Sequence, residues 1–550
     1  MKHALGLCVA FLSCVLDGAG AAQAQTFPKT DWFHEVFQRP GTPAQVPGPE
    51  KLRDYVADGK LRLTLDDAIR LALLNDTDVR VDKLQVESTQ LSITRAYSPF
   101  DPSLTSSFGA TRSVSPTSNQ LTSGQSVFSN LSQQSQVTYQ QLFQTGTIFN
   151  TNFSSGRNSN NNLFATFNPN FFSTLSFTFT QPLLRNRGLF INRAPILIAR
   201  RNYKQSIATF EGQVNDTVQQ VVAFYWAVVQ ARENLIVVQK SVDQAQASYN
   251  HDKRQLELGA LPPLNIYQSE SELATRRVSA IQAEYSLKEA EDTLRQILGA
   301  DLDSQVGALD LDLIEPTEPA GDLLTMDVAQ ALQRALDHRP EFEVLRQQLV
   351  VDDMNIRLAH NELQPSLNLQ GNYASSGLGG NQIDTTQTPP VVIAQGGFGD
   401  SISQLGSFKY PTYGFSLTLT LPIKNRQGEA DLASSEISKR RDLYSERRNE
   451  QTISLQVRNA IHQLEQSKLT LAASKISRDL AQKNLEAQQR KYELGAVDIF
   501  FVLDAQTALA TAESSLVSAQ VNYQEAVVAV QHSTGELLDR FNVQVAEPKK

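Results

Sequence analysis

An internal repeat limits the folds open to this chain more than any other feature of its sequence. The segment LGALPPLNIYQSESELATRRV resembles the later segment LGAVDIFFVLDAQTALATAES, with Gly259 and Gly495 at corresponding positions. The tripeptide Pro-Ser-Leu likewise begins at Pro102 and again at Pro365. Because a chain that repeats its sequence builds the same unit twice, we expect two copies of one order of elements: a helix, strands, a long helix, a turn and a returning helix.

The repeat and its flanking sequence predict six regions. These are a signal peptide at 1–24, an N-terminal extension at 25–62, a first repeat at 63–300, an acidic linker at 301–323, a second repeat at 324–539 and a C-terminal tail at 540–550. In the first repeat we expect strands at about 102–113 and 171–182, a long helix at 188–258 and a returning helix at 264–298. In the second repeat we expect strands at about 365–374 and 412–422, a long helix at 428–494 and a returning helix at 499–534.

The beginning of the chain has the pattern of a secretory signal peptide. Lys2 and the apolar run 4–16 precede a small-residue cleavage motif at 22–24. Both cysteines, Cys8 and Cys14, lie inside this segment, so an exported mature chain forms no disulfide. Two alternatives stay open, namely a buried first helix and lipid modification of Cys14. Since no run of about 18 apolar residues follows, we expect any membrane-spanning part to consist of strands.

Two segments, 188–258 and 428–494, have the composition of very long helices. Alanine, glutamine, leucine and charged residues dominate them, and Pro195 is their sole proline. About 65 residues at 1.5 Å each make a rod on the order of 100 Å, which is longer than a globular domain requires. The returning helices carry apolar or alanine residues at every seventh position, the spacing of a coiled coil. These residues are Ile266, Leu273, Ala280, Leu287 and Leu294 in the first repeat, and Val502, Leu509, Leu516, Tyr523 and Val530 beside Ala505, Ala512, Ala519 and Ala526 in the second.

The second long helix carries two such stripes at different angles. One consists of Leu464, Leu471, Leu485 and Tyr492, and the other of Ala473, Leu480, Ala487 and Leu494. A helix with one stripe needs one partner, whereas two narrow stripes suit a helix with a neighbour on each side. We therefore expect a wall or cylinder of helices. From the helices alone, a spectrin-like bundle or an intracellular coiled coil remains an alternative.

Four short segments, at 103–112, 172–180, 366–373 and 414–421, alternate apolar with hydroxyl or amide side chains. Each has about 10 residues, enough to cross a bilayer as a tilted strand. The helices already have packing partners in one another, through their heptad residues, so the apolar face of the strands needs another partner. We expect lipid on that face and a water-filled lumen on the polar face. The side chains predicted to face lipid include Leu175, Phe177, Phe179, Leu417, Leu419 and Leu421.

Four strands cannot close a barrel, and an open sheet edge in lipid leaves backbone groups unpaired. Three chains of four strands would supply twelve. The polar segments 112–135 and 374–409 between strands are typical of exposed loops. A further hairpin is expected at 135–155, about Thr145-Gly146, with no counterpart in the second repeat. It would extend the barrel, lie on the extracellular side, or make six strands per chain, and the sequence leaves these three open.

The composition argues against nucleic-acid binding and against catalysis. Lys and Arg number 49 against 58 Asp and Glu, a net charge of -9, so there is no basic excess for phosphates. The seven histidines are scattered, and no phosphate-binding loop or nucleophile motif is present. We therefore expect no enzyme activity, no catalytic residues, no cofactor and no metal site.

Nearly all of the chain after residue 63 resembles the TolC family of outer-membrane efflux proteins. The resemblance rests on LTLDDAIRLAL and its partner at 324, the two PSL strand starts, the junctions QPLLRNRG and LPIKNRQG, and YELGAVDIFFVLDAQTAL. It implies a mainly α protein with membrane β structure: long coiled-coil-like helices form a periplasmic α-barrel below a trimeric outer-membrane β-barrel, internally duplicated. It also implies a homotrimer in outer-membrane lipid that works with a periplasmic adaptor and an inner-membrane pump.

The same resemblance implies which residues form the periplasmic aperture. Asp504 in VLDA matches an aspartate of the family's helix tips, whereas Phe501 stands where the best-known members carry a second acid. In the first repeat, Asn265 and Gln268 hold the equivalent positions. Our hypothesis is that three copies of Asp504 form a cation-attracting ring. The alternative is an ordinary helix N-terminal aspartate stabilised by the helix dipole.

The glycines Gly259 and Gly495 are expected to allow the tight helix reversals that an adaptor contacts, or to serve the turns alone. The function implied is a passive outer-membrane export channel of a tripartite efflux or type I secretion system. The alternative is a trimeric coiled-coil scaffold, at the surface or in the periplasm, without transport. The duplicated strands favour the channel, because a stalk needs no barrel segment. The sequence does not name the cargo.

Overall fold

The computed structural model describes residues 46–117, 126–162, 164–258, 263–319, 323–387 and 391–545. The chain divides into two compact units, 1–48 and 49–550, and the second is described below. The predicted signal peptide, including Cys14, lies outside the described residues, as does the end of the C-terminal tail.

The repeat is visible in the order of the elements. The first repeat consists of α3 (Leu65–Asn75), α4 (Thr77–Ala96), β3 (Ser103–Pro116), β4 (Val127–Leu142), β5 (Ile148–Asn160), β6 (Phe167–Pro182), α6 (Leu189–Glu257) and α7 (Pro263–Ile297). The second consists of α8 (Val328–His338), α9 (Pro340–Glu362), β8 (Ser366–Asp384), β9 (Val391–Ala394), α10 (Phe398–Gly406), β10 (Pro411–Thr420), α11 (Arg426–Glu493) and α12 (Ile499–Thr534). The short elements are η1 (Leu52–Tyr55), β1 (Val56–Ala57), β2 (Lys60–Leu63), η2 (Ser98–Phe100), η3 (Ala300–Leu302), β7 (Asp310–Leu313) and α13 (Leu537–Arg540).

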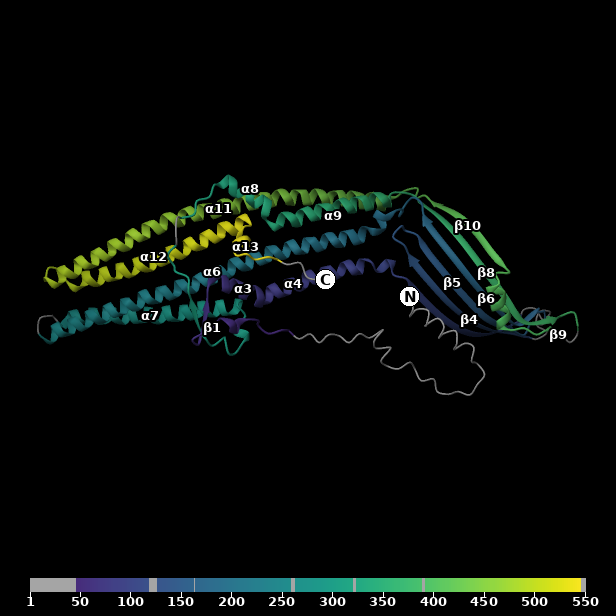
Figure 1. The fold of residues 1–550 in the computed structure, drawn as a ribbon, viewed down its shortest axis with the longest axis horizontal. Helices are drawn as coiled ribbons and strands as arrows, with labels where there is room; N and C mark the ends of the chain where they lie inside the picture. The colour runs from purple at the N-terminus through teal and green to yellow at the C-terminus, as the bar shows by residue number, and fades with distance from the viewer. Residues whose placement is uncertain are drawn as a thin grey trace. The chain divides into compact units, whose positions relative to one another are not determined.

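Corresponding residues cap the first helix of each repeat. The Thr64 side chain accepts a hydrogen bond from the Asp67 backbone N–H at the start of α3, and Asp67 completes a capping box. Asp327 accepts from the Gln330 N–H at the start of α8. The two long helices, α6 and α11, have 69 and 68 residues and run beside their returning helices, α7 and α12 (Figure 1). The predicted mainly α fold with long helices and a sheet is confirmed.

One apolar core joins the middle of α6 to the short elements around it. Val221, Val222 and Tyr225 of α6 are buried there with Leu61 and Leu63 of β2. β2 pairs in parallel with β7, so the C-terminal part of the predicted N-terminal extension is folded against the predicted linker. An 18-residue window of α6 has a mean hydropathy of 1.4, which by composition alone would allow a membrane span. These core contacts instead explain its apolar character.

A second core buries the predicted heptad seam between α11 and α12. Leu464 and Leu471 of α11 pack there with Ala519, Tyr523 and Ala526 of α12. The other predicted stripe of α11 is exposed in the single chain. Leu480 is 60% exposed and Leu494 is 83% exposed. One side of α11 therefore has its partner within the chain, and the other side is left open.

Apart from the small sheet β1-β2-β7, the described strands form one antiparallel sheet in the order β10-β8-β6-β5-β4-β3, with β9 paired to β8 (Figure 1). The additional hairpin expected at 135–155 is β4 and β5, and it lies in the sheet between β3 and β6, so the sheet has more than the four duplicated strands. The predicted loops are also shorter than expected: β3 continues to Pro116, β8 continues to Asp384, and 374–409 also contains β9 and α10. Ser401 of α10 packs on the sheet and shares a buried hydrogen bond of 2.9 Å with Ser173 of β6.

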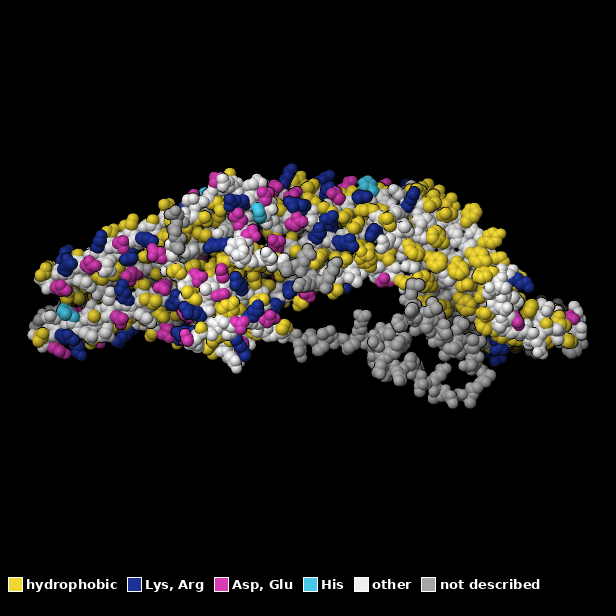
Figure 2. All heavy atoms as spheres, viewed as in Figure 1, with side chains coloured by type: hydrophobic (Ala, Val, Ile, Leu, Met, Phe, Trp, Pro, Cys, Tyr) yellow, Lys and Arg dark blue, Asp and Glu magenta, His cyan; other side chains and the backbone are white. Residues whose placement is uncertain are grey.

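Hydrophobic side chains gather over the sheet, whereas charged side chains lie over the helices (Figure 2). The strands β3, β4, β5, β6, β8 and β10 hold three charged residues, namely Arg112, Arg157 and Asp384. Arg112 and Arg157 each stand nine positions beyond the strand end nearest the helices, at Ser103 and Ile148. Nine residues at about 3.3 Å, tilted by about 40°, rise about 23 Å. This uncharged band matches the apolar height of an outer-membrane barrel.

Candidate functional site at the helix tips

Two helical hairpins, α6/α7 and α11/α12, end together at the end of residues 49–550 that lies farthest from the sheet (Figure 1). The turn after α11 depends on Gly495, whose φ of +71° lies in the left-handed region that favours glycine. Its N–H donates to the Tyr492 carbonyl at 2.9 Å, and the Ala496 N–H donates to the Lys491 carbonyl at 2.9 Å. These two hydrogen bonds satisfy backbone carbonyls at the C-terminus of α11, which would otherwise have no partner within the helix. The corresponding Gly259 lies outside the described residues.

Asp498, not Asp504, is the aspartate at the N-terminus of α12. The Asp498 side chain accepts a hydrogen bond from the Phe500 N–H at 2.9 Å. Asp504 lies in the second turn and is exposed to solvent. The stabilisation of an acid by the helix dipole falls off beyond the first turn, so the dipole alternative considered for Asp504 describes Asp498 instead.

Phe501 lies one turn before Asp504, and both side chains are exposed. The Phe501 ring contacts the Phe500 ring edge to face, with 5.7 Å between centroids. The opposite side of this helix is apolar, since Val502 packs with Leu485 of α11. The first turns of α12 therefore present a carboxylate and two aromatic rings to the surroundings. In the other hairpin Gln268 is exposed on α7, and the Asn265 side chain lies outside the described residues.

A buried carboxylate joins the two hairpins near their tips. Asp252 of α6 is 0% exposed. Its Oδ2 accepts a hydrogen bond from the Ser269 hydroxyl of α7, and its Oδ1 accepts one of 3.0 Å from the Tyr492 hydroxyl of α11. His251 Nδ1 lies 3.4 Å from Oδ1. Asp252 is therefore held by one residue of its own hairpin and one residue of the other.

The environment of Tyr492 keeps its hydroxyl protonated. Burial, and next the negative charge of Asp252, raise the pKa of Tyr492 above its ordinary value of about 10. The hydroxyl is therefore a donor throughout the neutral range. We did not predict this cluster from the sequence. One signal was present: Tyr492 stands in an apolar stripe, and a buried tyrosine hydroxyl usually requires a hydrogen-bond partner.

The comparison with protein families decides the identity of the chain. The family described as "Outer membrane efflux protein" matches residues 148–300 and 331–536. The chain belongs to the outer membrane efflux protein family. The predicted resemblance is confirmed, and the protein is an outer-membrane efflux channel with a periplasmic helical extension. A search of curated proteins by sequence found no match.

Several solved structures share the fold of this channel at low sequence identity. The CmeC outer membrane channel of Campylobacter jejuni is 15% identical with a TM-score of 0.59, and the match covers 94% of each chain. VceC of Vibrio cholerae is 13% identical with a TM-score of 0.60, covering 86% of this chain and 96% of that one. CusC is 16% identical with a TM-score of 0.61, covering 90% and 95%. These likenesses concern the fold.

Near the tips, the contacts within a hairpin of this channel differ from the contacts between its two hairpins. Within α11/α12 the seam near the tip is apolar, with Leu485, Ile499 and Leu509 buried. Between α12 and α6 the contacts from Ser518 to the tip are polar: Gln506 to Ser248 at 3.3 Å, Ser514 to Asn234 at 2.8 Å, Gln230 to Ser518 at 3.0 Å and Lys240 to Glu513 at 2.7 Å. Farther from the tip, Val521 and Val528 of α12 join the apolar core on α6. Among the described residues, no group of three or more His, Cys, Asp or Glu side chains is placed to hold a metal ion.

Proposed function

We propose that three copies of the chain close into one passive conduit, which receives solutes from a periplasmic adaptor and an inner-membrane pump and releases them outside the cell. The observation that carries this proposal is that each chain has two complementary open edges. Every residue of β3 and every residue of β10 is exposed. Within the described part of the chain, β3 pairs with β4 alone and β10 with β8 alone.

The directions of the strands allow these edges to meet. The six strands alternate in direction, so β3 and β10 are antiparallel to each other. An unpaired backbone group in hydrocarbon costs several kcal/mol. Pairing β10 of one copy with β3 of the next removes both open edges, and a ring of copies leaves none.

The helices are open on the same two sides. On one side, the helix that follows β10, α11, exposes an apolar row in heptad spacing at Leu455, Leu469 and Ile476. On the other side, the helix that precedes β3, α4, and the returning helix α7 expose apolar rows. Those of α4 are Val81, Leu84 and Leu91, and those of α7 are Val278, Ile281 and Tyr285. The strand edges and the helix edges therefore support the same neighbour.

The helix tips supply the regulated end of this conduit. In the closed form of the channel, the hydrogen bond from Tyr492 to Asp252 holds one hairpin against the other in each chain. The exposed Asp504 and Phe501 line the aperture, which these hydrogen bonds keep narrow. In this proposal an adaptor docks at the turn at Gly495 and at the corresponding sequence around Gly259. The channel itself performs no catalysis, so the energy for export comes from its partners.

Export and assembly measured together test this function. We expect native mass spectrometry in detergent to give a trimer, purified trimer to form ion-conducting pores in planar bilayers, and cells lacking the chain to lose export of at least one solute until complemented. A trimer without conductance, from a chain whose deletion leaves export unchanged, would instead support the scaffold alternative.

A further inference from the structure

We infer that the wall of the barrel contains six strands from each chain, and hence eighteen in the trimer. This inference rests on the proposed closure of three copies. The duplicated strands β3, β6, β8 and β10 would alone supply twelve. The remaining six come from the hairpin β4–β5, which the second repeat lacks. Each neighbouring copy completes the lumen, because no single sheet encloses it.

The hairpin is paired along its whole length. β4 pairs with β3 from Ser103↔Gln140 to Pro116↔Val127, and with β5 from Leu142↔Ile148 to Asn130↔Asn160. β5 continues the ladder into β6 from Ile148↔Thr180 to Asn158↔Asn170. A hairpin that stood above the membrane would leave β3 and β6 to pair with each other. Here β3 pairs with β4 of the hairpin and β6 pairs with β5, so β3 and β6 do not pair with each other.

The strand pairing carries both faces of the sheet across the hairpin in register. Val137 of β4, Phe153 of β5 and Leu175 of β6 stand in register on one face. On the opposite face Thr138, Asn152 and Ser176 stand in register, and the Thr138 hydroxyl donates to the Asn152 side chain at 3.0 Å. On the face predicted to meet lipid, the half of β4 and β5 nearer the helices thus carries Val137, Tyr139, Phe149 and Phe153, whereas Ser135, Ser155 and Arg157 follow in the half farther from the helices. The polar face of the duplicated strands, which would meet the lumen, extends over both strands.

The polar face of the hairpin carries no charge. Its polar side chains on β4 and β5 are Asn130, Ser132, Gln134, Gln136, Thr138, Gln140, Asn150, Asn152, Ser154, Asn158 and Asn160, and apolar Phe128, Leu142 and Ile148 stand at the strand ends. Amides and hydroxyls bind water and neutral polar groups without favouring either sign of charge. The added strands therefore widen the lumen without adding a charge filter.

The turn of the hairpin is fixed where strands pass into helices. The Thr147 hydroxyl donates to the Gln181 side chain at 2.5 Å, and the Gly188 N–H, just before α6, donates to the Thr145 carbonyl at 3.4 Å. Gly146 has a φ of +88°, and a Cβ there would stand 2.6 Å from the Asn186 carbonyl oxygen. This turn therefore belongs to the periplasmic rim of the barrel.

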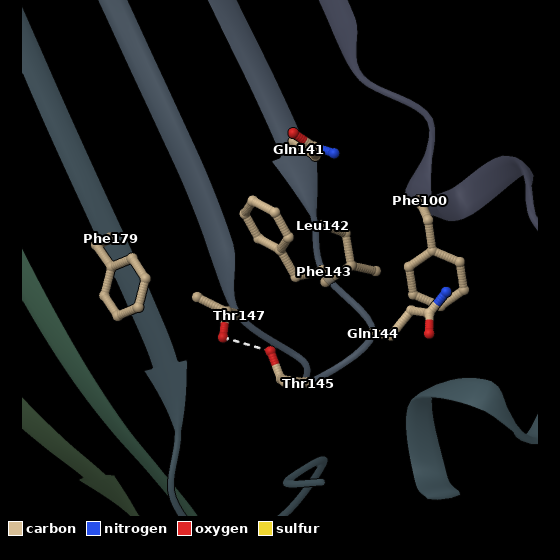
Figure 3. Close-up of a pocket in the computed structure, with 8 residues that line it drawn as sticks. All are labelled: Phe100, Gln141, Leu142, Phe143, Gln144, Thr145, Thr147 and Phe179. Atoms are coloured by element: carbon tan, nitrogen blue, oxygen red, sulfur yellow. Dashed lines mark hydrogen bonds between the residues drawn. The ribbon is translucent and has the colours of Figure 1, made fainter. Parts of the chain in front are cut away.

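Apolar side chains line an open pocket beside the β4–β5 turn. Phe100, Leu142, Phe143 and Phe179 line a cavity of about 650 Å³ between the β4–β5 turn and the start of β3 (Figure 3). The Thr145 and Thr147 hydroxyls are 2.7 Å apart at its edge. Below this level α4 still contacts α6, since Arg200 donates to the Tyr97 hydroxyl at 2.9 Å. The wall therefore widens at the sheet and not among the helices.

The strand count sets the width. At about 4.8 Å between strands and a tilt of about 40°, twelve strands enclose a backbone diameter of about 24 Å and eighteen about 36 Å. The cross-section enclosed by the backbone is then about twofold larger. A lumen of this width would let bulky polar cargo cross the outer membrane. The narrowest part of the channel would then lie at the helix tips.

Cysteine labelling distinguishes a wall strand from an external hairpin. Thr138→Cys and Asn152→Cys lie on the lumen face, and their neighbours Val137→Cys and Phe153→Cys on the lipid face. The native cysteines are at positions 8 and 14 alone. In liposomes we expect a water-soluble maleimide to label the first pair at least tenfold faster than the second. Ser176→Cys and Leu175→Cys on β6 are the matched controls. Equal rates on both faces of β4 and β5, with a difference on β6, would overturn the inference.

The number of strands is counted independently on the unmodified trimer. We expect electron cryomicroscopy to show eighteen strands in cross-section. A trimer with twelve strands would overturn this inference and leave the proposed conduit intact. An assembly that is not a trimer would overturn the proposed closure itself, so the two failures are distinguishable.

Discussion

Tyr492→Phe removes one hydroxyl from the tie between the two hairpins and changes little else. The ring stays in the apolar seam of α11, and its edge contact with His251, 5.9 Å between centroids, is retained. Asp252 keeps the Ser269 hydroxyl on its own hairpin and loses its bond to the other. The substitution destabilises the closed form alone. In the open form Asp252 accepts a hydrogen bond from water in place of the Tyr492 hydroxyl, so the open form loses nothing.

The size of the effect follows from the charge of the acceptor. A hydrogen bond to a charged group contributes about 1.5–3 kcal/mol. At 1.4 kcal/mol per factor of ten, its loss lowers the ratio of closed to open tips by roughly 10- to 140-fold for each chain. In the trimer three such ties are lost together. We therefore expect a channel that is mainly closed in the native form to conduct most of the time.

Planar-bilayer recording of purified trimer measures this ratio directly. Tyr444→Phe, an exposed tyrosine on the same helix, is the matched control and should leave the open fraction unchanged. The pKa of Tyr492 is raised, so the tie should persist below about pH 10 and weaken only as the pH rises further. If Tyr492→Phe leaves the open fraction at the native value, the tie does not hold the tips closed.

Three further predictions concern the aperture, the lipid face and the turn. Asp504→Asn should reduce cation selectivity and block by divalent cations in bilayers at unchanged trimer yield, and unchanged values of both would exclude the carboxylate ring. Leu417→Lys should destabilise the inserted channel by about 2 kcal/mol, measured as lost heat resistance of the trimer in gels, while Ser416→Lys on the opposite face should be tolerated. Gly495→Val forces a β-branched residue into φ +71° and should cost about 1–3 kcal/mol. Proteolysis at the tip should reveal it, and an unchanged rate would count against the strained turn.

The sequence predicted the parts of this fold that repeat or have a fixed period. The heptad residues Leu509, Tyr523 and Val530 are buried as expected because a seven-residue period defines one helix face. The number of strands stayed open at the level of sequence for a physical reason. The hairpin β4–β5 is rich in Gln, Ser and Asn, has no counterpart in the second repeat, and shows its place only through its pairing with β3 and β6.

The Asp252 cluster escaped prediction because its partners are far apart in sequence. Tyr492 is 240 residues from Asp252, and within α6 a lone aspartate has the pattern of a solvated helix residue. The aperture residues came from the resemblance to a family, and the structure adds that Asp504 is exposed and does not cap its helix. Periodicity identifies faces, whereas a hydrogen bond between distant segments requires the fold.

The contrast between apolar seams and polar contacts indicates how the tips open. Separating α11 from α12 would expose buried Leu485, Ile499 and Leu509 to water, at about 1.5–3 kcal/mol for each large side chain. Separating α12 from α6 between the tips and Ser518 exchanges hydrogen bonds such as Gln506 to Ser248 for bonds to water, a net loss of about 0.5–1.5 kcal/mol each. The apolar contacts of Val521 and Val528 with α6 stay in place. We therefore expect each hairpin to move as a unit.

Thiol cross-linking tests this mode of opening. A short bifunctional thiol reagent that joins Ser248→Cys to Gln506→Cys links the two hairpins and should abolish conductance, even in the Tyr492→Phe background. The same reagent between Gln246→Cys and Arg277→Cys, which contact each other at 2.7 Å within the α6/α7 hairpin, should leave conductance unchanged. Loss of conductance in the second variant would mean that opening requires the helices of one hairpin to separate, and the rigid-hairpin mechanism would then be wrong.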